Sequence, residues 1–114
     1  MEARVRKSDN VTIVDLTGDL VIGDGDEVLH DLLDQLLPAG TRHVLVNLAG
    51  VSRMDSSGIG ELVAGWKLAK RHGASLRLLR PGDQVRFTLH LTQVLPLIEV
   101  YEDEQQALAA FASS

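Results

Sequence analysis

Two neighbouring serines, Ser56 and Ser57, lie between Asp55 and Gly58 in the stretch of this chain where chemistry is easiest to place. A serine hydroxyl can cap a helix, accept a covalent modification or, beside a base, act as a nucleophile. Gly58, with Gly60 two residues later, leaves room for another molecule to come close. Local chemistry alone leaves two interpretations open: the serines only cap a helix, or one of them is modified or contacts a ligand.

The flanking residues predict that these serines lie between a buried strand and a helix. Residues 42–48 are apolar and rich in β-branched side chains, which is typical of a central strand covered on both faces. After the serines, a helix is predicted over about residues 56–71 because apolar side chains recur at helical spacing: Ile59, Leu62, Val63, Trp66 and Ala69. Asp55 or Ser56 is expected to cap this helix. In α/β sheets, ligands and partners collect at such junctions.

The histidines and glycines do not indicate catalytic, metal or nucleotide chemistry. The four histidines fall on four different predicted elements: His30, His43, His72 and His90. No base is therefore placed beside a serine, and no metal-ligand spacing is present. The nucleophile pattern Gly-x-Ser-x-Gly is absent, and Gly58-x-Gly60 alone is not a phosphate-binding fingerprint. We expect no enzyme activity, no metal and no cofactor.

The composition predicts one globular domain over residues 1–114. With 45% hydrophobic and 24% charged residues, the chain can bury one core. Its formal net charge of −5 argues against binding to nucleic acid or to an anionic membrane surface. The sequence has no cysteine, no apolar run that could span a membrane and no apolar signal segment near Met1. These features favour a cytoplasmic protein without membrane insertion.

The remaining pattern predicts an α/β fold, a small mixed β-sheet with an N-terminal hairpin and about four helices packed on it. The hairpin is expected to join residues 5–7 with residues 11–17, where Gly18 ends the strand. Two further strands are expected at residues 74–79 and, interrupted by Pro96, at residues 94–100. The other helices are expected at residues 28–37, 84–91 and 103–111.

An acidic turn, residues 23–27, precedes the first of these helices. Asp24 or Asp26 is expected to cap it, with Glu27 in the first turn. A calcium loop would need further oxygen ligands and a distal glutamate, and neither is present. The turn is therefore expected to start a helix and to bind no metal.

Three segments, in order along the chain, resemble the STAS domain family and, more narrowly, its bacterial anti-sigma factor antagonists. They are residues 16–20 (LTGDL), 44–48 (VLVNL) and 51–60 (VSRMDSSGIG). The resemblance is collinear over nearly the whole chain and includes residues 104–108 near its end. It implies a sheet with one main layer of helices and with the Asp-Ser-Ser-Gly turn exposed at the rim.

The resemblance also implies a function. In the family, the first serine of the motif is phosphorylated by the ATP-dependent anti-sigma factor kinase that is also the binding partner, and a phosphoserine phosphatase reverses the change. Carried onto this chain, unphosphorylated protein binds an anti-sigma factor serine kinase and frees the sigma factor, and phosphorylation of Ser56 switches the binding off. The implied partner-binding residues are Asp55, Ser56, Ser57, Gly58 and Asp24.

One position departs from the family pattern. Family members usually have an aspartate after the Gly-Glu-Leu strand end, near the phosphorylated turn, and the aligned residue here is Val21. Asp24 or Asp26 takes its place if the loop is longer. The departure concerns kinase recognition more than the fold. It leaves an alternative open: a STAS subunit of a larger assembly, such as a lipid-transport ATPase complex or a stress-signalling scaffold, that binds proteins without being phosphorylated.

Overall fold

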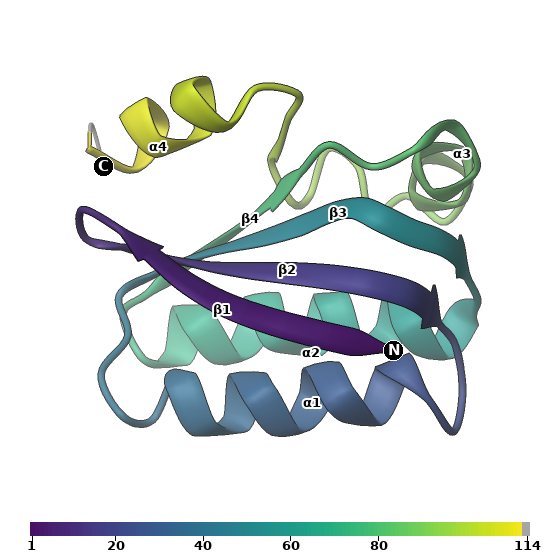
Figure 1. Ribbon diagram of the computed structural model, residues 1–114, viewed down its shortest axis with the longest axis horizontal. Coiled ribbons are helices and arrows are strands. Elements are labelled where there is room, and N and C mark those ends of the chain that lie inside the picture. The colour runs from purple at the N-terminus through teal and green to yellow at the C-terminus, as the bar shows by residue number, and fades with distance from the viewer. Residues whose placement is uncertain (113–114) are drawn as a thin grey trace.

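The computed structural model describes residues 1–112 and contains one five-stranded sheet with four helices packed on it (Figure 1). The strands are β1 (Glu2–Ser8), β2 (Val11–Leu20), β3 (His43–Met54), β4 (Ser75–Leu79) and β5 (Val100–Tyr101). The helices are α1 (Gly25–Leu36), α2 (Ser56–Arg71), α3 (Asp83–Leu91) and α4 (Glu104–Ala112). The predicted mixed sheet with an N-terminal hairpin is confirmed.

The sheet has the strand order β1-β2-β3-β4-β5. β1 and β2 are antiparallel, and the other neighbouring pairs are parallel. The carboxyl ends of β2, β3 and β4 therefore meet at one end of the sheet, and α1, α2 and α3 start from that end (Figure 1). This arrangement brings residues 55–58, which we call the serine turn, close to the loop that follows β2.

Both faces of the sheet carry apolar side chains, and the expectation of one main helix layer was incomplete. On one face, α1 and α2 pack side by side over the larger core, which includes Leu29, Leu33 and Leu62 (Figure 1). On the other face, α4 buries Ala107 and Phe111 in a second cluster. The strands supply four residues to that cluster: Val11, Ile13, Leu45 and Leu79. Alternate residues of a strand point to opposite faces of the sheet. The apolar side chains of Ile13 and Leu45 lie on the second face, where α4 covers them.

An ion-pair network holds α4 to the hairpin. The guanidinium of Arg6 donates hydrogen bonds to Asp15 at 2.6 Å and to Glu104 at 2.5 Å. The bonds from Arg6 hold the pKa of the Glu104 carboxyl below its ordinary value. Because the network joins residues of β1, β2 and α4, it fixes the last helix against the start of the chain.

The two long central strands extend further than predicted. β2 does not end at Gly18 but continues to Leu20, with Gly18 at a φ of +116° and a register shift after it. β3 was predicted only as far as residue 48 but continues to Met54, so the segment directly before Asp55 and the serines is also strand. The extensions pair with each other, Gly18 beside Val51 and Leu20 beside Met54. Pairing between distant segments, rather than local composition, lengthens both strands.

The last predicted strand was largely wrong. Residues 95–98 form a turn and a bend, with a cis peptide bond between Leu95 and Pro96, and of the predicted segment only its end belongs to a strand, Val100–Tyr101. Proline has no N–H to donate to a sheet ladder, which explains why pairing starts only after it. The short β5 nevertheless lies at the edge of the sheet, beside β4.

Candidate functional site

Asp55 is the N-cap of α2, which decides between the two residues proposed for that position. One of its carboxylate oxygens, Oδ1, accepts a hydrogen bond from the N–H of Gly58 at 3.0 Å. Its backbone is extended, with a φ of −104°, and its carbonyl accepts the N–H of Ile59 at 3.0 Å. This is the usual way in which an aspartate satisfies the free N–H groups at a helix start.

The other carboxylate oxygen of Asp55 binds the loop after β2. Oδ2 accepts a hydrogen bond from the backbone N–H of Ile22 at 3.0 Å, and the N–H of Asp55 itself donates to the carbonyl of Leu20 at 3.3 Å. The hydrogen bonds from Ile22 and then Gly58 hold the pKa of the Asp55 carboxyl below its ordinary value. Asp55 thus ties the β2–α1 loop (residues 21–24) to the start of α2.

Gly58 lets the helix start approach β2 closely. Gly58 is buried, and a Cβ added there would collide with the carbonyl oxygen of Leu20 and lie 3.0 Å from the Cγ of Met54. No atom lies within 4 Å of the corresponding position at Gly60. Of the two glycines in the motif, only Gly58 therefore lies where the surrounding atoms leave no room for a side chain.

The two serines are not equally accessible. Ser56 is the first residue of α2 and is exposed, whereas Ser57 is half-buried. The first turn of α2 contains no acidic residue, so Asp55 is the carboxylate that faces the positive end of this helix dipole. Ser56 is consequently the more accessible of the two serines.

Asp24 lies on the exposed β2–α1 loop at the N-cap position of α1 but makes no capping bond with its side chain. Its carboxylate instead pairs with the amino group of Met1 at 3.0 Å. Asp26 accepts the N–H groups of Asp24 and Glu27 and so holds the turn. The structure brings Asp55, Ser56, Ser57 and Gly58 together, and it connects the Asp24 loop to them through Ile22.

An acidic hollow of about 450 Å³ lies between the first halves of α1 and α2. It is lined by Asp26, Glu27, His30, Asp31 and Glu61. His30 Nδ1 lies 3.1 Å from a Glu61 oxygen, and this contact raises the pKa of His30 above its ordinary value. The surface beside the serine turn is therefore rich in carboxylates.

Three exposed apolar side chains at the same end of the sheet were not assigned from the sequence. They are Ile22 on the β2–α1 loop and Phe87 and Leu91 on α3, a helix that starts from this end (Figure 1). Phe87 and Leu91 are four residues apart and share a helix face, whereas the buried residues of α3 are Val85 and Leu89. The sequence therefore contained a sign that Phe87 and Leu91 are exposed, because they lie outside the core-facing stripe of α3. It contained no comparable sign for Ile22.

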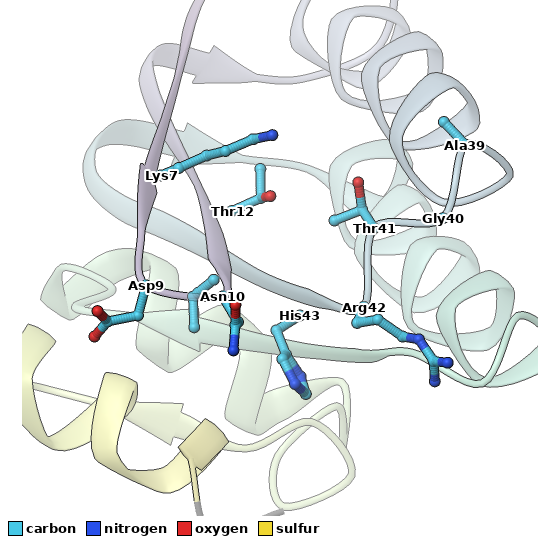
Figure 2. A pocket seen from close by; sticks show the side chains of 10 residues that line it. Lys7, Asp9, Asn10, Thr12, Ala39, Gly40, Thr41, Arg42 and His43 are labelled. Atoms are coloured by element: carbon cyan, nitrogen blue, oxygen red, sulfur yellow. The ribbon is translucent and has the colours of Figure 1, made fainter.

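Another hollow lies at the opposite end of the sheet. It measures about 480 Å³ and lies between the β1–β2 turn and residues 39–43, and no predicted site residue lines it (Figure 2). Lys7 extends over Thr12 there, across from Ala39 and Gly40 (Figure 2).

Within residues 1–112, no group of three or more His, Asp or Glu side chains is arranged to hold a metal ion. In the same described part of the chain, no helix combines the length and the apolar character needed to cross a membrane.

Comparison with known proteins places this geometry in a family. The STAS domain family model matches residues 2–107. The anti-sigma F factor antagonist of Paenibacillus polymyxa is 26% identical over 98 residues, 86% of this chain and 84% of that protein. The anti-sigma-B factor antagonist of Staphylococcus aureus is 32% identical over 74 residues, 65% of this chain and 68% of that protein.

A solved structure of the same family has the same fold. The anti-sigma factor antagonist SpoIIAA in its unphosphorylated form superposes with a TM-score of 0.83 at 18% identity, covering 99% of this chain and 98% of that one. Its phosphorylated form from Bacillus gives a TM-score of 0.74 at the same identity, covering 96% and 99%. Together with the family-model match over almost its whole length, this likeness identifies the chain as a member of the STAS domain family.

Proposed function

We propose that this chain is an anti-sigma factor antagonist controlled by phosphorylation of Ser56. In its unphosphorylated form it binds an anti-sigma factor serine kinase and thereby frees the sigma factor; phosphorylated, it no longer binds. The names of the Paenibacillus and Staphylococcus relatives support the antagonist role. The observation that carries the proposal is an exposed serine at the first position of a helix, beside an aspartate that anchors that helix to a neighbouring loop.

The fold is expected to tolerate the phosphate. A phosphoserine carries about −1.5 to −2 charges at neutral pH. At Ser56 the phosphate would lie at the N-terminus of α2, where the helix dipole favours an anion and where Asp55, which caps the N–H of Gly58, is followed by no acidic residue in the first turn. Ser56 is also exposed, so the added group displaces no core side chain. That SpoIIAA is known in both forms with this fold is consistent with such tolerance.

Binding, in contrast, is expected to be lost. The phosphate would join Asp55 on a surface that already carries the carboxylates of Asp26, Glu27 and Asp31. Burying this added charge against a partner costs desolvation and like-charge repulsion, which is a common way to reject the wrong state. The proposed switch therefore acts at the interface while the domain stays folded.

The switch has a defined binding surface and depends on a second enzyme that reverses the phosphorylation. The partner-binding surface contains Asp55, Ser56, Ser57, Gly58 and Asp24, and a phosphoserine phosphatase restores the binding form. The chain acts in the cytoplasm, as a single domain of residues 1–114, by binding a protein and without an enzyme activity of its own. Neither nucleic acid nor membrane insertion is part of the function.

Phosphorylation by the cognate kinase tests the proposal. The protein is incubated with the anti-sigma factor kinase and ATP, and its intact mass is measured before fragmentation locates the modification. We expect the mass of one phosphate, placed on Ser56, and the same gain for Ser57→Ala but none for Ser56→Ala. Phosphate on Ser57 alone, or on neither serine, contradicts the assignment.

A second candidate is the STAS subunit of a larger assembly that works without phosphorylation. It is favoured by the β2–α1 loop, where an apolar Val21 stands near the serine turn and the Asp24 carboxylate is paired with the Met1 amino group. An assembly subunit would bind its partner equally well with serine, alanine or aspartate at position 56, whereas the phosphorylation switch would not.

A further inference from the structure

We propose that Ile22 is an apolar anchor of the partner-binding surface and that Asp55 is the residue that positions it beside Ser56. The inference rests on the proposed function, since it names a further contact of the same surface. The partner it requires is an anti-sigma factor that offers an apolar pocket next to the group that approaches Ser56.

The side chain of Ile22 belongs to neither of the two core clusters. Its side chain is 72% exposed, compared with 68% for Leu91 and 65% for Phe87 among the exposed large apolar residues of the described chain. Single exposed apolar residues are common on proteins and need no explanation alone. What distinguishes Ile22 is how its backbone is held.

The β2–α1 loop is fixed to the serine turn at two points around Ile22. The N–H of Ile22 donates to Asp55 Oδ2 at 3.0 Å. Two residues earlier, the carbonyl of Leu20 accepts the N–H of Asp55 at 3.3 Å and lies against Gly58. An exposed apolar side chain on a backbone fixed in this way loses little freedom on binding, which is the property expected of an interface anchor.

The second oxygen of Asp55 is the feature that a capping role leaves unexplained. One side-chain oxygen is enough to cap a helix, and serine or asparagine does so as well as aspartate. Asp55 uses Oδ1 for the N–H of Gly58 and Oδ2 for the N–H of Ile22, residues that belong to different elements. The carboxylate therefore couples the position of Ile22 to that of Ser56, the next residue along the chain.

Binding of Ile22→Ala to the anti-sigma factor tests the anchor. Calorimetric titration of the unphosphorylated protein should show a Kd raised about tenfold or more, as expected for truncation of an anchor residue, with an unchanged melting temperature. Leu97→Ala is the matched control, because Leu97 is 48% exposed and lies beside Trp66 and Lys70, in the second half of α2. Wild-type affinity for Ile22→Ala, or an equal loss for Leu97→Ala, overturns the anchor.

Asp55→Ser tests the positioning role. Serine keeps the cap on the N–H of Gly58 but lacks a second oxygen for Ile22, so the melting temperature should stay close to that of the wild type while the affinity falls. In the Asp55→Ser background, Ile22→Ala should then weaken binding less than it does in the wild type. Fully additive losses overturn the coupling of Asp55 to Ile22.

The outcomes also separate this inference from the proposed function. If Ser56→Asp abolishes binding while Ile22→Ala binds like the wild type, the phosphorylation switch stands and the anchor is overturned. If the wild-type protein binds no anti-sigma factor, both are overturned.

Discussion

The Cα of Gly58, in the first turn of α2, lies against the carbonyl oxygen of Leu20, the last residue of β2. A methyl group at position 58 would collide with that oxygen and would also lie 2.9 Å from the Cγ of Leu20. The closeness of this contact sets the position of the serine turn relative to the β2–α1 loop. Gly58 therefore helps to position the serine turn by allowing α2 to start close to the end of β2.

Alanine substitutions at the two glycines of the motif should have opposite effects on stability. Gly58→Ala forces the helix start away from β2, and we expect it to lower the free energy of unfolding by about 1–3 kcal/mol, as overpacking does. Gly60→Ala meets open space and should raise it by about 0.5–1 kcal/mol, since alanine favours a helix interior. Urea unfolding of both variants measures the difference. Equal effects would mean that the approach of Gly58 to Leu20 is not tight.

Trp66 contributes less to the core than its place in the helical pattern suggests. The sequence predicts it to lie on the apolar face of α2, but it is only half-buried, with the Lys70 ammonium 4.2 Å from its ring centre. Leu62 on the same helix is fully buried. We expect Leu62→Ala to cost about 3 kcal/mol and Trp66→Ala about 2 kcal/mol, because a half-buried side chain loses less contact. A larger loss for Trp66→Ala in chemical denaturation would contradict this order.

The contact of His30 with Glu61 predicts a pH dependence of stability. The folded protein raises the pKa of His30 above 6.5, so it binds this proton more tightly than the unfolded chain does. The resulting stabilisation is complete below the unfolded pKa and disappears as the pH rises through the folded pKa. The free energy of unfolding of the wild type should therefore exceed that of His30→Gln by more at about pH 5.5 than at about pH 8. The reverse order would show that the contact does not stabilise the protonated form.

The start of α2 could be predicted from the sequence because its determinants are local. A capping residue at Asp55, two serines after it and apolar residues at helical spacing all lie within one short segment. The sequence left the choice of cap between Asp55 and Ser56, and only the hydrogen bond to Gly58 decides it. The serine turn accordingly lies where the sequence predicts it, between a buried strand and a helix.

The features that the sequence analysis missed depend on contacts between segments that are distant in the sequence. Ser52 and Arg53 are exposed and polar, so nothing local indicates that β3 reaches Met54; pairing with the end of β2 decides it. The bond between Ile22 and Asp55 joins residues 33 positions apart, and the bond between Arg6 and Glu104 joins residues 98 apart. No spacing rule within one segment predicts such contacts.

The central claim is that the charge at position 56 controls binding to the anti-sigma factor while the fold is unchanged. Ser56→Ala should bind the partner as the unmodified protein does, and ATP should never release it. Ser56→Asp should keep its circular dichroism spectrum and its melting temperature, since Ser56 is exposed and an anion suits the helix N-terminus.

The decisive measurement is a titration of the anti-sigma factor with Ser56→Ala and Ser56→Asp side by side, with circular dichroism as the control for folding. We predict tight binding for Ser56→Ala and a steep loss of affinity for Ser56→Asp, in which like charge and desolvation at one interface position cost up to several kcal/mol. A carboxylate carries less charge than a phosphate, so the affinity lost in Ser56→Asp should be smaller than the affinity lost when Ser56 is phosphorylated. Equal affinities for two folded variants would contradict the account and would leave Ser56 as an ordinary first residue of a helix.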